Sequence, residues 1–245
     1  MRKFLTTLFV TLLFANVTFA QHTYALLVGV SKYDLPAEYD ADRNMMATHM
    51  KDIKSILSQQ KDITVAILTS KNANPQNIKK KLNAIVKLAK SNDKIMFFYG
   101  GHGAEGALVC HNGDHLPFVD LLTLLTKAKT PYVFCFLEAC HSGSVKDAIS
   151  KTDTRKVNPV FMTAARDDES SVNYLLTNSS LFLRALTKGL RGKADGNGDK
   201  NLTVSELYKY VYNDVREHVK SVPDCDQHPQ LIGPSKLFDT VITSW

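Results

Sequence analysis

Cysteine is scarce in this chain of 245 residues, with only four, and tryptophan occurs once. Four cysteines are too few for a disulfide scaffold, and a chain of this length can bury a hydrophobic core without one. The sequence has no internal repeat, no low-complexity tract and no G-x-S-x-G nucleophile elbow. These absences exclude a disulfide-rich miniprotein and a solenoid, and they disfavour a serine hydrolase.

Charge of one sign is also lacking. The chain has 30 basic and 24 acidic side chains, and the N-terminal 20 residues contribute two of the basic ones, Arg2 and Lys3. No stripe of clustered lysine and arginine remains in the rest. We therefore expect no nucleic-acid partner.

The N-terminus carries the longest apolar stretch. Arg2 and Lys3 precede an apolar core from Phe4 to Phe14, and a small residue, Ala20, follows. This layout is typical of a secretory signal peptide, and the run is too short for a comfortable membrane span. The alternative is an uncleaved N-terminal anchor. We expect a signal peptide at residues 1–20, a domain at 21–245, no stable membrane span and a secreted or periplasmic protein.

Short apolar strand patterns alternate with helical ones along the domain. This alternation predicts an α/β fold of three layers, α/β/α, with a mostly parallel central sheet of about six strands and helices on both faces. The predicted strands are Tyr24–Val30, Ile63–Leu68, Lys94 to His102, Tyr132–Leu137 and Val160–Ala165. The predicted helices are Asp40–Gln60, Pro75 to about Lys90 with Asn74 as N-cap, Val119–Lys127, Leu181–Leu190 and Val204–Val219, with a hairpin near residues 111–114.

Two of the predicted strands end in residues that can carry chemistry. One runs into F-F-Y-G-G-H-G, which ends with His102 and Gly103, and the next runs into F-L-E-A-C-H-S-G-S around Cys140. Open α/β sheets bind ligands at the carboxyl ends of their strands. His102 and Cys140 are therefore expected to face one cleft, with Cys140 as a nucleophile and His102 as its base and later the acid. The alternative is a buried cysteine and an unrelated surface histidine.

Neighbours of Cys140 indicate what such a cleft would bind. Residues two apart on a strand share a face, so Glu138 is expected to look into the same cavity as Cys140 and to favour a cationic substrate side chain. The alternative for Glu138 is a structural ion pair. His141, next to Cys140, should point the opposite way and is not expected to be the base.

The two strand ends resemble the His and Cys boxes of metacaspases and bacterial caspase-like cysteine peptidases. Y-A-L-L-V-G-V-S-K-Y, at Tyr24 to Tyr33, resembles the first strand of those families, so the likeness covers most of the chain after residue 21. The resemblance implies a thiol protease that acts on peptides or proteins and needs no cofactor for the chemistry. It also implies that the N–H groups of Gly103 and Cys140 stabilise the oxyanion.

The same resemblance implies residues for substrate binding. Metacaspases cleave after Arg or Lys and usually have Asp at the place of Glu138. An acid resembling Asp42 completes their pocket, and the loop that resembles Thr163–Asn173 lines the groove, with Ser171 as the expected contact. Asp167, Asp168 and Glu169 in this loop could instead form a solvated acidic loop.

Two other functions stay open. The E-A-C-x-S-G-S pattern is also similar to legumain, an asparaginyl endopeptidase. A catalytically silent caspase-like binding module is the alternative from outside the enzymes.

Residues 142–158 form a polar stretch that includes Lys146, Lys151, Arg155 and Lys156 and lacks sustained apolar periodicity. It is predicted to be an exposed linker, at the place where caspases separate their large and small subunits. Cleavage there by the protein itself or by another copy is a hypothesis that follows.

A twelve-residue stretch, D-G-N-G-D-K-N-L-T-V-S-E, has the oxygen spacing of an EF-hand calcium loop. The oxygens would come from Asp195, Asn197, Asp199, Asn201, Thr203 and Glu206. Lys200 stands where such loops have glycine, which weakens the prediction of a calcium site. The alternative is a polar turn between helices, with Thr203 as N-cap and Glu206 in a capping box.

The remaining cysteines have no predicted catalytic role. Cys135 lies inside an apolar strand and is expected in the core. Cys110 and Cys225 could pair in an oxidising compartment, although the sequence does not place them together. A zinc site at Cys110, His111 and His115 is disfavoured because no fourth ligand is identifiable.

Overall fold

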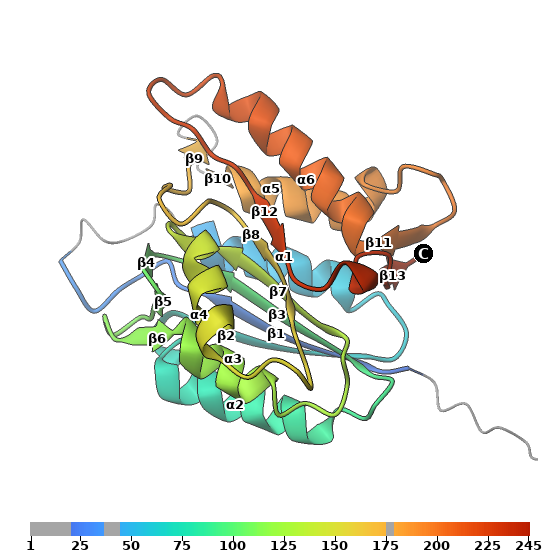
Figure 1. Cartoon of the computed structure of the whole chain (residues 1–245). Coiled ribbons are helices and arrows are strands. Elements are labelled where there is room, and N and C mark those ends of the chain that lie inside the picture. Colours follow the sequence, from blue (N-terminus) through green and yellow to red (C-terminus); the bar gives the residue numbers. More distant parts are fainter. Residues whose placement is uncertain (1–20, 37–44, 175–178) are drawn as a thin grey trace, which may run out of the picture.

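A six-stranded sheet forms the centre of the protein, seen in a computed structural model that describes residues 21–36, 45–174 and 179–245 (Figure 1). Its strand order is β12-β8-β7-β3-β1-β2, and only the edge strand β12 runs antiparallel to its neighbour. The predicted class, a mostly parallel sheet of about six strands, is confirmed. The strands are β1 (Thr23–Gly29), β2 (Ile63–Thr69), β3 (Lys94–Gly100), β7 (Val133–Glu138), β8 (Val160–Thr163) and β12 (Gln230–Ile232).

Helices cover both faces of this sheet, as the alternation of strands and helices predicts (Figure 1). On one face lie α1 (Met45–Leu57), α5 (Leu181–Lys188) and α6 (Val204–Val219). On the other lie α2 (Pro75–Leu88), α3 (Phe118–Leu125) and α4 (Val145–Lys151). A five-residue π-helical turn, Gly189–Lys193, continues α5, and short 3₁₀ turns occur at Ser70–Asn72, Ser142–Ser144 and Ser235–Leu237.

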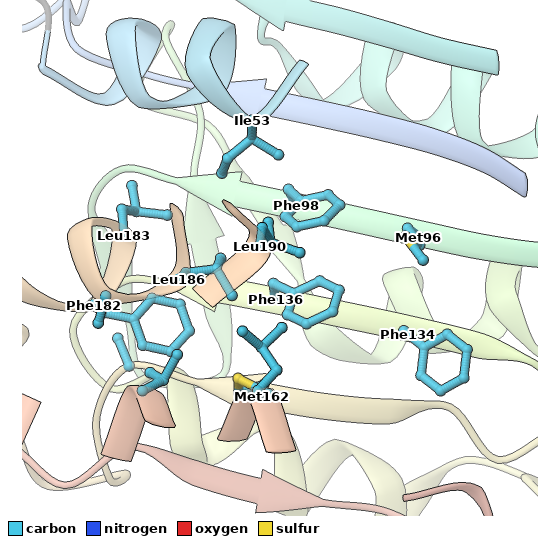
Figure 2. Close-up of a cluster of buried hydrophobic side chains, with 14 of the residues drawn as sticks. Ile53, Met96, Phe98, Phe134, Phe136, Met162, Phe182, Leu183, Leu186 and Leu190 are labelled. Atoms are coloured by element: carbon cyan, nitrogen blue, oxygen red, sulfur yellow. The ribbon is translucent and has the colours of Figure 1, made fainter. Parts of the chain in front are cut away.

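Alternate residues of the central strands enter two separate hydrophobic cores. Phe98 and Phe136 pack toward α1 and α5, and their rings stack with centroids 4.5 Å apart. Figure 2 shows them with residues of the helices, including Ile53 and Leu186. Phe97 and the other alternate residues belong to the core on the opposite face. Strands buried on both faces need continuous apolar runs, which is what the sequence of β3 and β7 supplies.

Side chains at helix starts agree with the sequence signals. Asn74 caps α2, because its Oδ1 accepts the N–H of Asn77 at 2.9 Å, and Pro75 is the first helical residue. At α6, Thr203 Oγ1 accepts the N–H of Glu206 at 3.2 Å, and Glu206 Oε2 accepts the N–H of Thr203 at 3.0 Å. Both predicted caps are therefore present, the second as a full capping box.

Smaller sheets lie at the edges of the molecule. The predicted hairpin near residues 111–114 is confirmed, since it connects β5 to β6. The smaller sheets pair β4 with β5 and β6, β9 with β10, and β11 with β13. Their strands are β4 (Gly103–Ala104), β5 (Ala107–Val109), β6 (His115–Pro117), β9 (Asn173–Tyr174), β10 (Ser179–Ser180), β11 (Asn201–Thr203) and β13 (Val241–Ser244).

The prediction of an exposed linker over residues 142–158 needs correction. Its first ten residues form the 3₁₀ turn and helix α4, and Val145 and Ala148 are buried against the core. A helix this short offers too few apolar positions for a periodicity to be recognised. The exposed side chains of the following stretch include Asp153, Arg155 and Lys156.

Residues 1–20, the predicted signal peptide, lie outside the described residues. Among those that the structure describes, no helix has the length and apolar character needed to span a bilayer. The secreted or periplasmic location therefore stays a prediction.

Candidate active site

The ends of β3 and β7 lie side by side because the two strands pair in parallel. Gly100 is the partner of Glu138 in this register, and the N–H of Gly101 donates to the carbonyl of Glu138 at 3.1 Å. Two residues further on, a Cβ added to Gly103 would lie 2.2 Å from the carbonyl oxygen of Cys140. The chain segment that carries His102 is thus in backbone contact with the segment that carries Cys140.

The hydroxyl groups of two tyrosines hydrogen-bond to the backbone of His102. Its N–H donates to Tyr33 Oη at 2.7 Å, and Tyr99 Oη shares its one proton between the carbonyl of His102 at 2.9 Å and that of Val109 at 2.6 Å. The N–H of Val109 donates to the His102 carbonyl at 3.0 Å, which ties His102 to β5. The Tyr33 ring also packs on the imidazole, with centroids 4.9 Å apart. His102 is therefore fixed in its backbone and packed on its ring.

The turn after β7 fixes the chain on the other side of Cys140, which is itself partly exposed. His141 adopts a left-handed conformation with φ 56°, and its N–H donates to the carbonyl of Glu169 at 2.9 Å. Its Nδ1 lies 2.7 Å from the carbonyl of Asp167. The ring of His141 is therefore bound to the loop after β8.

Glu138 is a buried carboxyl group beside this turn, with 1% of its surface exposed. The hydroxyl of Ser171 donates to its Oε1, and its Oε2 is buried without a hydrogen-bond partner among the described residues. Burial raises the pKa of Glu138 to about 7, and the hydroxyls of Ser171 and Ser180 oppose the rise in part. Among the described residues, no basic group is paired with Glu138, so the alternative of a structural ion pair gains no support there.

A family model supplies the classification. The model of the caspase domain matches residues 22–236, which is most of the chain. The chain belongs to the caspase domain family. It therefore carries a caspase-like cysteine peptidase domain, and the expected likeness to caspase-like proteins is confirmed at the level of this family.

Individual relatives are more distant. A vacuolar-processing enzyme of Arabidopsis thaliana is 35% identical over 91 residues, which make up 35% of this chain and 19% of that protein. A vacuolar-processing enzyme of Ricinus communis is 34% identical over 87 residues, or 34% of this chain and 17% of that protein. A crystal structure of a Geobacter sulfurreducens protein covers 91% of this chain and 98% of its own, with a TM-score of 0.66 and 17% identity. That likeness shows the caspase-like fold alone.

Ser171 and Glu138, predicted for substrate binding in this caspase domain, are in contact, whereas Asp42 lies outside the described residues. The loop after β8 is less solvated than a free acidic loop would be. Glu169 is bound to His228 and Asp167 to Lys146, at 2.6 and 2.7 Å, while Asp168 is exposed.

In the predicted calcium loop, the aspartate side chains accept backbone N–H groups of the loop itself. Asp195 accepts the N–H groups of Gly198 and Lys200 at 2.8 and 3.0 Å, and Asp199 accepts that of Asn201 at 2.7 Å. In the part of the chain that the structure describes, no group of three or more His, Cys, Asp or Glu is arranged to hold a metal ion. Calcium binding stays a prediction, and the alternative, a capping box at α6, is observed.

The other cysteines are free thiols. Cys135 is buried, as predicted, and burial raises its pKa. Cys110 is fully buried, and burial raises its pKa to about 12, whereas Cys225 is exposed. Cys110 and Cys225 therefore do not pair in this structure.

Sequence reasoning missed the residues that support the site. Tyr33 and Tyr99 look like ordinary aromatic residues of apolar segments, and the tyrosine hydroxyls were the signal that could have marked them, since a buried hydroxyl needs a partner. Gln227 and His228 belong to no motif, and their contacts are with residues about 60 positions away.

We expect Gly103→Ala to reduce turnover by about 100-fold, because the added Cβ forces apart the two segments that carry His102 and Cys140. The overlap with the Cys140 carbonyl should also cost about 1–3 kcal/mol of unfolding free energy. Gly196→Ala is the matched control, since a Cβ there meets nothing within 4 Å. Turnover and urea unfolding of both variants check the prediction, and equal effects would contradict it.

Glu138→Gln should make stability less dependent on pH. The pKa of Glu138 rises from 4.5 to about 7 in the folded state, so between these values the native protein keeps a proton that the unfolded chain has lost. Stability of the wild type should therefore fall as pH rises through this window, by on the order of 3 kcal/mol, and the neutral glutamine should not show this loss.

Urea unfolding at pH 5 and pH 8 measures this difference. Glu105→Gln, the same change at an exposed site, is the control. An unchanged pH dependence in Glu138→Gln would show that burial does not raise the pKa of Glu138.

Proposed function

We propose that this protein is a cysteine endopeptidase, with Cys140 as the nucleophile and His102 as the proton carrier, that prefers Arg or Lys before the scissile bond. The observation that supports it most is the backbone contact between Gly103 and Cys140 in a chain of the caspase domain family. That contact puts a histidine and a partly exposed cysteine on adjoining turns at one edge of the sheet. The relatives named as vacuolar-processing enzymes also favour an enzymatic role.

The chemistry needs two half-reactions. In the first, His102 takes the proton of the Cys140 thiol and the sulfur attacks the peptide carbonyl, while the N–H groups of Cys140 and Gly103 stabilise the oxyanion. His102 then gives that proton to the leaving amine. In the second, His102 takes a proton from water, which attacks the thioester and releases the acid and the Cys140 thiol. The backbone hydrogen bonds of Tyr33 and Tyr99 keep His102 in place for both steps.

Glu138 is the basis for the preference proposed. A buried, ionised carboxylate with one oxygen that has no partner among the described residues gains one when a guanidinium or ammonium group enters. The neutral form, which is populated because the pKa is about 7, can instead donate to and accept from a carboxamide. This property keeps asparagine as the second candidate, so a legumain-like specificity remains the alternative.

Other parts of the proposal rest on the sequence. They are secretion through residues 1–20, a peptide or protein substrate without nucleic-acid partners, and calcium binding by the loop from Asp195 to Glu206. The exposed residues near Arg155 are the proposed point of self-cleavage, since a basic side chain is accessible there.

A peptidyl-arginine reagent with an electrophilic warhead should label wild-type protein at Cys140. We expect no labelling in Cys140→Ala, and labelling at least about 100-fold slower in His102→Ala, because the base is lost. Cys225→Ala and His115→Ala remove an exposed thiol and an exposed imidazole and should not change the rate. Mass spectrometry of the labelled peptide measures the outcome. Absence of labelling in the wild type would contradict the preference for Arg, and absence of labelling by a peptidyl-asparagine reagent as well would favour a silent binding module.

Cleavage of a peptide library tests the specificity. Glu138→Gln should lower kcat/KM for Arg and Lys substrates by about 10- to 100-fold, since a charged hydrogen bond is lost, and should change that for Asn substrates much less. For the wild type, cleavage after Arg should rise with pH through about 7 as Glu138 ionises. An Asn preference in the wild type that survives in Glu138→Gln would support the legumain-like alternative instead.

A further inference from the structure

A completely buried polar side chain, Gln227, lies in the segment between α6 and β12. Its carboxamide is satisfied at both ends. Oε1 accepts the N–H of Val172 at 2.9 Å, and Nε2 donates to the carbonyl of Ala164 at 2.9 Å. A buried amide that has both partners in good geometry is a strong local constraint.

These partners bracket one loop. Ala164 directly follows β8, and Val172 directly precedes β9, so one side chain joins the two ends of the loop at residues 164–172. Ser171 belongs to this loop, and its Oγ lies 3.5 Å from Nε2 of Gln227. Because Nε2 can only donate, this contact leaves the Ser171 proton for the carboxyl group of Glu138.

The next residue, His228, binds the middle of the same loop. The N–H of His228 donates to Oε2 of Glu169 at 2.9 Å, and its Nδ1 lies 2.6 Å from Oε1. The carbonyl of Glu169 in turn accepts the N–H of His141, which follows Cys140. Gln227 and His228 therefore connect the 164–172 loop to the turn after β7, which carries Cys140 and His141.

We propose that Gln227 is a positioning residue that determines specificity, because it holds the 164–172 loop so that Ser171 is hydrogen-bonded to Glu138. This inference rests on the proposed function, in which Glu138 and Ser171 bind the substrate side chain. Gln227 does not touch the reacting atoms itself. An amide serves both contacts at once, because its carbonyl oxygen accepts and its N–H group donates.

The test uses Gln227→Met, which has nearly the same length but no amide, and Gln227→Ala. Hydrogen exchange of peptides that cover residues 164–172 should become at least about tenfold faster in both variants, as buried hydrogen bonds are lost. The peptidyl-arginine reagent should then label Cys140 about 10- to 100-fold more slowly, through weaker initial binding. Alkylation of Cys140 by iodoacetamide, which needs no pocket, should change less than about twofold, because Glu169, which accepts the N–H of His141, is still bound to His228.

Two control variants separate positioning from general destabilisation. Gln76→Ala removes an exposed glutamine of α2 and should change none of the three readouts. Leu82→Ala removes a fully buried side chain of the same helix, in the core on the other face of the sheet from Val172. It should lower the Tm without changing the ratio of the labelling rates with the peptidyl-arginine reagent and iodoacetamide.

The outcomes are distinct. Unchanged exchange in the loop, or a loss of the same size with both reagents, would overturn the positioning role. Faster exchange with an unchanged ratio of labelling rates would also overturn it. If the loop loosens but the wild type itself does not react with the peptidyl-arginine reagent, the proposed specificity fails, while the control of the loop by Gln227 is supported.

Discussion

Parallel pairing between β3 and β7 is the constraint on which the site depends. Strands that pair in parallel run in the same direction, so their chains leave the sheet at the same edge. The register that sets Gly100 opposite Glu138 brings the two following turns into contact within a few residues. The hydrogen bond from Gly101 to the carbonyl of Glu138 extends the pairing beyond the strands. A shift of this register would separate His102 from Cys140, whatever the rest of the fold did.

Burial on both faces is what fixes that register. β3 and β7 send alternate side chains into two cores, each closed by its own set of helices (Figure 1). The stacked rings of Phe98 and Phe136 in one core connect the same two strands (Figure 2). Slipping one strand by a residue would exchange the contents of both cores, which close packing does not tolerate.

Polar groups at the edge of the sheet are held mainly through the backbone. Tyr33 and Tyr99 bind the N–H and the carbonyl of His102, while Glu169 and Gln227 bind main-chain atoms around Cys140 and Ser171. Supports of this kind fix the position of a residue and leave its side chain available for other contacts. Glu138 is the exception, because its buried carboxyl group has a raised pKa and one oxygen that no other part of the described structure partners. A side chain kept in such an unfavourable state is typical of a functional site.

The sequence by itself determined how the main strands and helices alternate along the chain, the caps of α2 and α6, and the two motifs that carry His102 and Cys140. These are local features, since periodicity and capping depend on residues within one or two turns of each other. Only the tertiary structure decided that residues 142–151 are packed as a turn and a helix, that Cys110 and Cys225 are free thiols, and that β12 pairs antiparallel at the edge of the sheet. It also decided the neighbours of Glu138 and the place of Gln227. Those contacts join residues that lie 33 to 63 positions apart, and a pairing over that distance leaves no pattern in either segment alone.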